Sequence, residues 1–129
     1  MTAVLFVCTG NAARSQMAEG WLKKLKPQYS VLSAGTKPEG LSSKAIKAMQ
    51  EVGLEISDQT SKHIDEVPWK TADFVITLCD SANGICVSMA WPETCKRMHW
   101  PIKDPVSYED YRSARDEIKS KLENFLKSL

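Results

Sequence analysis

The sequence predicts an α/β domain in which a parallel sheet carries helices on both faces. Short apolar runs rich in β-branched residues alternate with segments whose apolar residues recur at helical spacing. Continuous apolar runs are typical of strands buried on both faces, and strands alternating with helices favour right-handed crossovers and a parallel sheet. The 129 residues are enough for one domain with its own core, so we expect a single domain over residues 1–129.

Four segments are predicted to be strands. Residues 3–7 and 74–78 are short apolar runs with valine and isoleucine, and residues 29–33 form a third run ahead of the glycine-containing AGTKPEG loop. Residues 94–100 are expected to contain a short, late strand. If the first strand lies in the middle, the second and third strands flank it.

Three longer segments are predicted to be helices. Residues 15–25, 42–52 and 108–129 each place apolar side chains along one helical face, and Gly53 is a typical stop for the second of them. Residues 57–71 are polar and contain a proline, so we expect a loop there with at most one helical turn.

Composition excludes several classes of function. The formal charge is +1 without a basic tail or stripe, so nucleic acid is not an expected partner. No apolar run reaches about 18 residues, and the first residues lack the features of a signal peptide, so we expect no membrane partner and a cytoplasmic protein. The four cysteines and two histidines lack the spacing of zinc ligands, so no metal and no cofactor are expected.

Two cysteines are predicted to lie at the same edge of the sheet. Cys8 follows the first strand directly, and Cys79 follows the third. In doubly wound sheets, ligands bind beyond the carboxyl ends of the strands, where the winding changes direction. If these two strands are neighbours, their ends lie about 5 Å apart, so both thiols reach the place where this architecture puts chemistry.

The stretch CTGNAARS, residues 8–15, is predicted to bind a tetrahedral oxyanion. A tight loop before a helix directs backbone N–H groups and the helix dipole into one concavity, and Arg14 adds a bidentate fork. The same field lowers the pKa of Cys8, and the Ser15 hydroxyl can hydrogen-bond its sulfur. Gly10 and Asn11 tolerate left-handed conformations. The remaining residues of this loop are Thr9, Ala12 and Ala13.

These motifs resemble a known family over the whole chain. CTGNAARS, the following QMAEGW, SAGT, AIKAM, TSK, TLC and the late DP are similar to segments of thioredoxin-coupled arsenate reductases, which have the low-molecular-weight protein tyrosine phosphatase fold. The resemblance implies a four-stranded parallel sheet in the order 2-1-3-4 and arsenate as the substrate. We expect a monomer.

The resemblance also implies roles for residues outside the loop. Asp104, before a proline, is the candidate general acid. Reduction of arsenate needs two electrons, which two thiols supply by forming a disulfide: Cys79 attacks the arseno-cysteine at Cys8, and Cys86 then attacks Cys79. If residues 80–86 are helical, Cys79 and Cys86 lie about 10 Å apart, whereas a disulfide needs Cα atoms within about 7 Å, so this segment must unwind. Asp80 and Ser81 are the expected caps of that helix, and Asn83 and Gly84 weaken it.

Other functions share the same socket. A low-molecular-weight phosphatase needs the thiolate and Asp104 but neither Cys79 nor Cys86, and an anion sensor needs only the socket. Thioredoxin is the implied reductant, although glutaredoxin with glutathione, or mycothiol with mycoredoxin, serves related enzymes.

A further expectation concerns support of the loop. In potassium-binding relatives, a cation is held by positions that match Asn11, Glu19 and Ser33, and by an aspartate where this chain has Lys62. We therefore expect Lys62 to replace the ion and to pair with Glu19.

Three residues capable of chemistry fall outside these motifs. Cys95, His63 and His99 adjoin none of them and are expected to be surface or packing residues.

Overall fold

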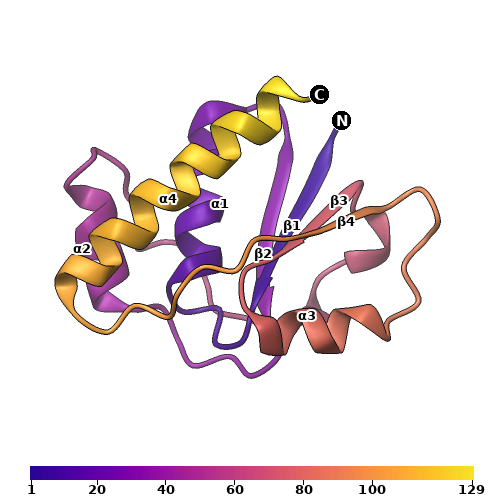
Figure 1. Cartoon of the computed structure of the whole chain (residues 1–129), viewed down its shortest axis with the longest axis horizontal. Helices are drawn as coiled ribbons and strands as arrows, with labels where there is room; N and C mark the ends of the chain where they lie inside the picture. The colour runs from indigo at the N-terminus through magenta and orange to yellow at the C-terminus, as the bar shows by residue number, and fades with distance from the viewer.

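The computed structural model describes residues 1–129, and at its centre lies a four-stranded parallel sheet (Figure 1). The strand order is β2-β1-β3-β4, which confirms the predicted 2-1-3-4 arrangement. The strands are β1 (Ala3–Cys8), β2 (Ser30–Gly35), β3 (Phe74–Thr77) and β4 (Lys96–His99).

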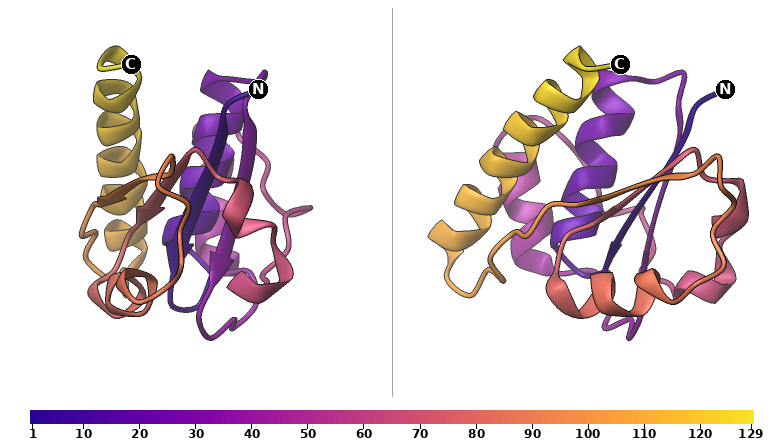
Figure 2. Two further views of the ribbon diagram at one scale, coloured as in Figure 1. Left: turned by 90° about the vertical axis from the view of Figure 1, so that its right-hand side faces the viewer. Right: turned by 45° about the vertical axis from the view of Figure 1, so that its right-hand side comes forward.

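Helices cover both faces of the sheet, as predicted (Figure 2). On one face lie three helices that pack against one another: α1 (Arg14–Leu25), α2 (Ser43–Gln50) and α4 (Tyr108–Lys127). The other face is covered by α3 (Asp80–Val87) and by two 3-10 helices, η1 (Ile64–Glu66) and η2 (Trp69–Thr71). No helix combines the length and the apolar composition needed to cross a bilayer.

The core explains why the strands are apolar without alternation. Val4, Phe6 and Ile76 lie on the face covered by α1 and α4, where Phe74 stacks edge-on against Phe125 at a centroid distance of 5.1 Å. Leu5 and its register partners on the opposite face pack toward η2 and α3. Successive side chains of a strand point to opposite faces of the sheet. Because both faces are covered, both sets of side chains are buried.

Several predicted ends differ from the structure by one or two residues, and two differences from expectation lie close to the site. β2 continues to Gly35 because that residue pairs with Cys8, and a side chain there would bring its Cβ to 2.6 Å from the Thr9 carbonyl oxygen. Residues 57–71 contain η1 and η2 rather than a single turn. His63 caps η1 by accepting a hydrogen bond from Asp65 N at 3.0 Å.

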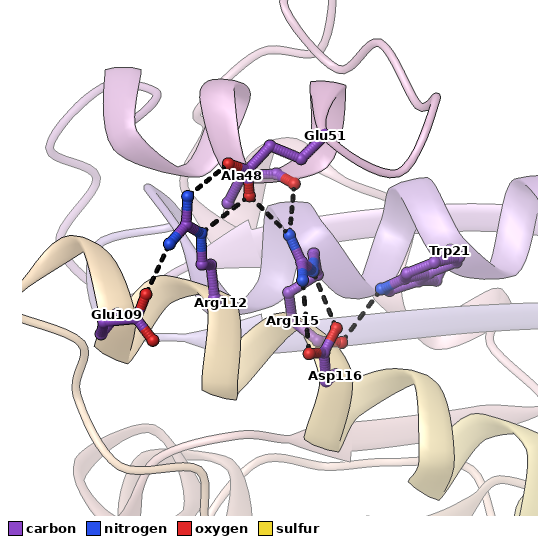
Figure 3. A network of polar contacts seen from close by, with 7 residues as sticks. All are labelled: Trp21, Ala48, Glu51, Glu109, Arg112, Arg115 and Asp116. Atoms are coloured by element: carbon purple, nitrogen blue, oxygen red, sulfur yellow. Dashed lines mark hydrogen bonds and ion pairs between the residues drawn. The ribbon is translucent and has the colours of Figure 1, made fainter.

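A polar network fixes α4 to α2 (Figure 3). Arg115 is buried, and its Nη1 donates to Ala48 O at 2.9 Å and to Glu51 Oε1 at 3.0 Å. Arg112 binds the same carboxylate, and its hydrogen bond, helped by Arg115, lowers the pKa of Glu51 to about 2. Trp21 Nε1 donates to Arg115 O at 3.1 Å, so the network also holds α1, the helix that follows the predicted oxyanion loop.

Candidate active site

The loop between β1 and α1 is held open by a second loop wrapped around it. Residues 36–42 donate backbone hydrogen bonds to this first loop: Lys37 N to Thr9 O at 2.8 Å, Glu39 N to Gly10 O at 2.9 Å and Ser42 N to Ala12 O at 2.9 Å. No side chain caps the first turn of α1, and its N–H groups are therefore free to receive an anion.

The two residues expected to adopt left-handed conformations behave differently. Asn11 does so, with φ at 46°, but Gly10 does not, so the expectation for Gly10 is wrong. A Cβ at Gly10 would lie 3.0 Å from Oε2 of Glu39, an exposed side chain that can move aside. The neighbouring loop therefore lies close to this position without excluding other residues.

Cys8 receives a hydrogen bond whose direction the surrounding atoms determine. Lys62 N donates to Asn11 Oδ1 at 3.0 Å, which orients the Asn11 amide so that Nδ2 donates to Ser15 Oγ at 2.7 Å. The Ser15 hydroxyl therefore keeps its own proton for Cys8 Sγ, which lies 2.9 Å away. The structure therefore places Ser15 within hydrogen-bond distance of the Cys8 sulfur, which is the contact that the sequence predicted.

The predicted oxyanion residues meet around one hollow of about 310 Å³. Asn11 and Ser15 are fully buried beneath it. The hollow is lined by Cys8, Thr9, Gly10, Ala12, Ala13, Arg14, Glu39, Asp104 and Tyr111. Arg14 Nη2 lies 3.5 Å from Asp104 Oδ1, and Arg14 Nη1 donates to Ile102 O at 2.9 Å, so the guanidinium is held at the edge of the hollow beside the carboxylate.

Cys79 lies where β3 meets α3, next to the end of β1. Val7 pairs with Thr77 across the two strands, and Leu78 N donates to Val7 O at 2.9 Å. The Cys79 sulfur lies 3.1 Å from Thr9 Oγ1 and accepts a hydrogen bond from Ala82 N at 3.4 Å. Cys79 itself therefore caps α3, not Asp80 or Ser81 as expected.

Cys86 lies in the last turn of α3, so residues 80–86 are helical, which was the condition for the unwinding argument. Its thiol is buried, and this burial, together with the nearby Cys79, raises the pKa of Cys86 to about 11. Ile85 and Val87 beside it are exposed, and Trp91 Nε1 donates to Cys86 O at 2.8 Å. All four cysteines are free thiols.

The cation beside Glu19 is not the expected one. Glu19 is 3% exposed and pairs with Lys23 one helical turn along α1, while its Oε1 accepts the Ser33 hydroxyl proton at 2.6 Å. Asn11 Nδ2 donates to Ser33 Oγ at 3.0 Å, which links this group to the loop. Lys62 Nζ instead donates to Thr60 O at 3.0 Å, and burial lowers the pKa of Lys62 although Glu19 opposes that shift. The expected Lys62–Glu19 ion pair is replaced by Lys23–Glu19, because residues four apart on a helix share a face.

Sequence reasoning did not single out four residues that lie around the site. Gln16 is fully buried and donates to Asn11 Oδ1 at 3.1 Å, and Glu39 and Tyr111 line the hollow. His99, expected to be a surface or packing residue, contacts Asp80. A buried glutamine in the first turn after the loop was the one available signal; the other three residues lie far from the loop in the chain. Cys95 is buried and contacts no residue of the site.

Known proteins are similar to this chain over nearly its whole length. Residues 3–129 match the family described as low molecular weight phosphotyrosine protein phosphatase. An arsenate reductase of Staphylococcus aureus (strain Newman) is 45% identical over 125 residues, which cover 95% of this chain and 94% of that protein. A solved structure described as an arsenate reductase in the phosphate binding state has a TM-score of 0.83 and 34% identity, covering 99% and 98% of the two chains. A low molecular weight protein tyrosine phosphatase from T. tengcongensis has a TM-score of 0.84 and 30% identity, with full coverage of both chains.

Proposed function

Since this chain belongs to the low molecular weight phosphotyrosine protein phosphatase family, we propose that it uses the family's anion site to reduce arsenate to arsenite. The observation that carries the proposal is the position of Cys79. Its thiol lies against Thr9 of the oxyanion loop, one residue beyond Cys8. Relatives that carry the name arsenate reductase at 45% identity support the same reaction. Hydrolysis of a phosphate ester would need no second thiol at this place.

In the first step, the Cys8 thiolate attacks the arsenic atom of arsenate held by Arg14 and the loop amides. An oxygen of arsenate leaves as water, for which Asp104 supplies a proton as the general acid, and a Cys8 sulfur–arsenic bond forms. Asp104 lies at the same edge of the hollow as Arg14, with 3.5 Å between the two charged groups. The Ser15 hydroxyl supports the reactive thiolate at 2.9 Å.

In the second step, the Cys79 thiolate attacks the sulfur of Cys8. The electron pair of the sulfur–arsenic bond passes to arsenic, which leaves as arsenite, and a Cys8–Cys79 disulfide remains. The two thiols lose the two electrons that arsenic gains. The N–H of Ala82 and the hydroxyl of Thr9 both lie against Cys79 Sγ and hold the sulfur beside the loop that begins at Cys8.

In the third step, the Cys86 thiolate attacks Cys79, and Cys8 leaves as a thiolate. The Cys79–Cys86 disulfide then lies beside the exposed Ile85 and Val87, where a dithiol protein can reduce it. We propose thioredoxin as that reductant, with glutaredoxin and glutathione as the alternative, and the cytoplasm as the compartment, because a reducing environment keeps the thiols free. The enzyme acts as a monomer and needs neither metal nor cofactor.

The decisive experiment measures arsenite production by the purified protein. Thioredoxin, thioredoxin reductase and NADPH are compared with glutathione, glutaredoxin, glutathione reductase and NADPH. We expect arsenite with the thioredoxin system and little with the other. No arsenite with either system, or with mycothiol and mycoredoxin, would refute the proposed reaction.

The second candidate function is phosphate ester hydrolysis, which the likeness to a tyrosine phosphatase favours. The Cys8→Ser variant tests whether the two reactions use the same nucleophile or two independent sites. Because both reactions begin at the Cys8 sulfur, the variant should lose arsenate reduction and p-nitrophenyl phosphate hydrolysis together. Retention of either activity would show that Cys8 is not the common nucleophile.

A further inference from the structure

His99, the last residue of β4, contacts β3 and α3. None of these three segments lines the anion hollow. Its Nε2 lies 2.9 Å from Oδ1 of Asp80, the first residue of α3. Its Nδ1 lies 2.8 Å from Oγ1 of Thr77, the last residue of β3. The Thr77 hydroxyl in turn reaches Oδ1 of Asn83 in α3 at 3.2 Å. A chain of polar contacts therefore runs from β4 through β3 to the first turn of α3.

The two halves of α3 are held very differently. The first half is fixed through Asp80 and Asn83, and Asn83 N also donates to Cys79 O at 3.1 Å. In the second half, Ile85 and Val87 are exposed, and a Cβ added at Gly84 would have no atom within 4 Å. Unwinding of the second half would release the buried Cys86 side chain and the hydrogen bond that its carbonyl accepts from Trp91, while it leaves the contacts of Asp80 and Asn83 in place.

His99, Thr77, Asn83 and Cys86 all line one hollow of about 290 Å³ next to α3. The hollow leaves space directly beside Cys86 and Val87, in the second half of the helix. The charged groups around His99 are Asp80, at 2.9 Å and with a side chain 92% exposed, and Arg97, which lines the same hollow. A contact with so exposed a carboxylate contributes little to global stability, so its influence is local.

We propose that His99 is a positioning residue for the thiol relay. It holds the first turn of α3, and with it Cys79, while the Gly84–Val87 half unwinds and brings Cys86 to Cys79. This inference rests on the proposed relay, in which Cys79 must remain in place through two successive steps: it first attacks Cys8 and is then attacked by Cys86. In the second of these, the Cys79–Cys86 bond forms, the Cys8–Cys79 bond breaks, and Cys8 keeps the electron pair as a thiolate.

His99→Phe tests the proposal, because phenylalanine keeps a ring but removes both nitrogens. We expect amide exchange of residues 80–83 in the reduced protein to accelerate by about three- to tenfold, since losing a hydrogen bond of about 1 kcal/mol changes an equilibrium by that order. In a Cys86→Ser background, the single release of arsenite should slow by a similar factor. Affinity for inorganic phosphate, measured by calorimetry, should stay within about twofold, because His99 does not line the anion hollow.

Three further variants separate positioning from a general loss of structure. Asp80→Ala changes an exposed side chain and should accelerate exchange of residues 80–83 in the same way without risk to folding. His99→Gln retains an amide donor toward Asp80 and should restore part of the protection. His63→Phe removes the other histidine that lies near an aspartate, Asp65 at 3.5 Å, and should leave residues 80–83 and arsenite release unchanged.

The exchange measurement needs no arsenate, so it is independent of the proposed function. If the wild type releases no arsenite, the proposed function fails, whereas the contact between His99 and α3 is still tested by exchange. Unchanged protection of residues 80–83 in His99→Phe and Asp80→Ala would overturn the proposal. So would unaltered arsenite release from His99→Phe, or an equal loss of phosphate affinity and arsenite release.

Discussion

The hydroxyl oxygen of Thr9 lies 3.1 Å from the sulfur of Cys79, and this contact joins the end of β1 to the N-terminus of α3. Thr9 also lines the anion hollow. One side chain therefore contacts the second thiol of the proposed relay while its own backbone forms part of the loop proposed to hold arsenate. The two proposed functions of the site, anion binding and thiol attack, meet at this residue.

Thr9→Val removes the hydroxyl and retains the shape of the side chain. We expect the attack of Cys79 on the Cys8 adduct to slow by about three- to tenfold, because a hydrogen bond to the attacking sulfur is lost. Single-turnover release of arsenite in a Cys86→Ser background measures this step. Thr60→Val, at an exposed position, is the matched control. An unchanged rate would show that Thr9 does not assist Cys79.

Cys86→Ser should stop multiple turnovers and still release about one equivalent of arsenite, because the first two steps use only Cys8 and Cys79. The product should be a trapped Cys8–Cys79 disulfide. Peptide mapping by mass spectrometry under non-reducing conditions checks this. Cys95→Ser is the matched control, since Cys95 is buried apart from the site, and it should turn over normally. Absence of the Cys8–Cys79 bond would contradict the order of the relay.

Labelling of Cys86 in the reduced protein should depend steeply on pH. Burial and the nearby Cys79 raise the pKa of Cys86 to about 11. At about pH 8, its thiolate is roughly a hundredfold scarcer than in the unfolded chain. Reaction with iodoacetamide should therefore be at least that much slower in the native protein, and it should accelerate as the pH rises toward 11. A native rate at pH 8 that equals the rate in urea would show that Cys86 is already exposed and ionised.

Activity should be insensitive to potassium, because Lys23 already supplies the positive charge beside Glu19. The comparison is between sodium and potassium chloride at matched ionic strength. Lys23→Gln removes that charge and should make the enzyme respond to potassium, whereas Lys24→Gln, on the exposed side of α1, should not. Lys62→Asp tests the remaining role of Lys62, and we expect potassium activation in that variant as well, because it adds a carboxylate close to Glu19. Strong activation of the wild type by potassium would refute the explanation that the Lys23 ammonium group takes the place of a bound cation.

Local sequence determined the strands, the helices and the oxyanion loop of this protein. Buried parallel strands need continuous apolar runs, and a strand followed by CTGNAARS brings Cys8, Arg14 and Ser15 together, because they lie within one loop and one helical turn. The alternation of strands and helices also predicted that Cys79 lies at the edge formed by the carboxyl ends of the strands. These features depend on residues close together in the chain.

Only the tertiary structure decided which distant side chains meet. Lys23 rather than Lys62 pairs with Glu19, because the pairing depends on the rotation of α1 about its axis and on where residues 60–62 cross it. The contact of His99 with Asp80 requires β4 to lie beside β3 in a particular register. The carboxylate of Glu39 lies beside Gly10 although it comes from another loop, and a Cβ there would be 3.0 Å from Oε2. Hydrogen bonds and ion pairs act over a few ångströms, so such contacts are fixed only when packing of the whole domain sets the relative positions of its elements.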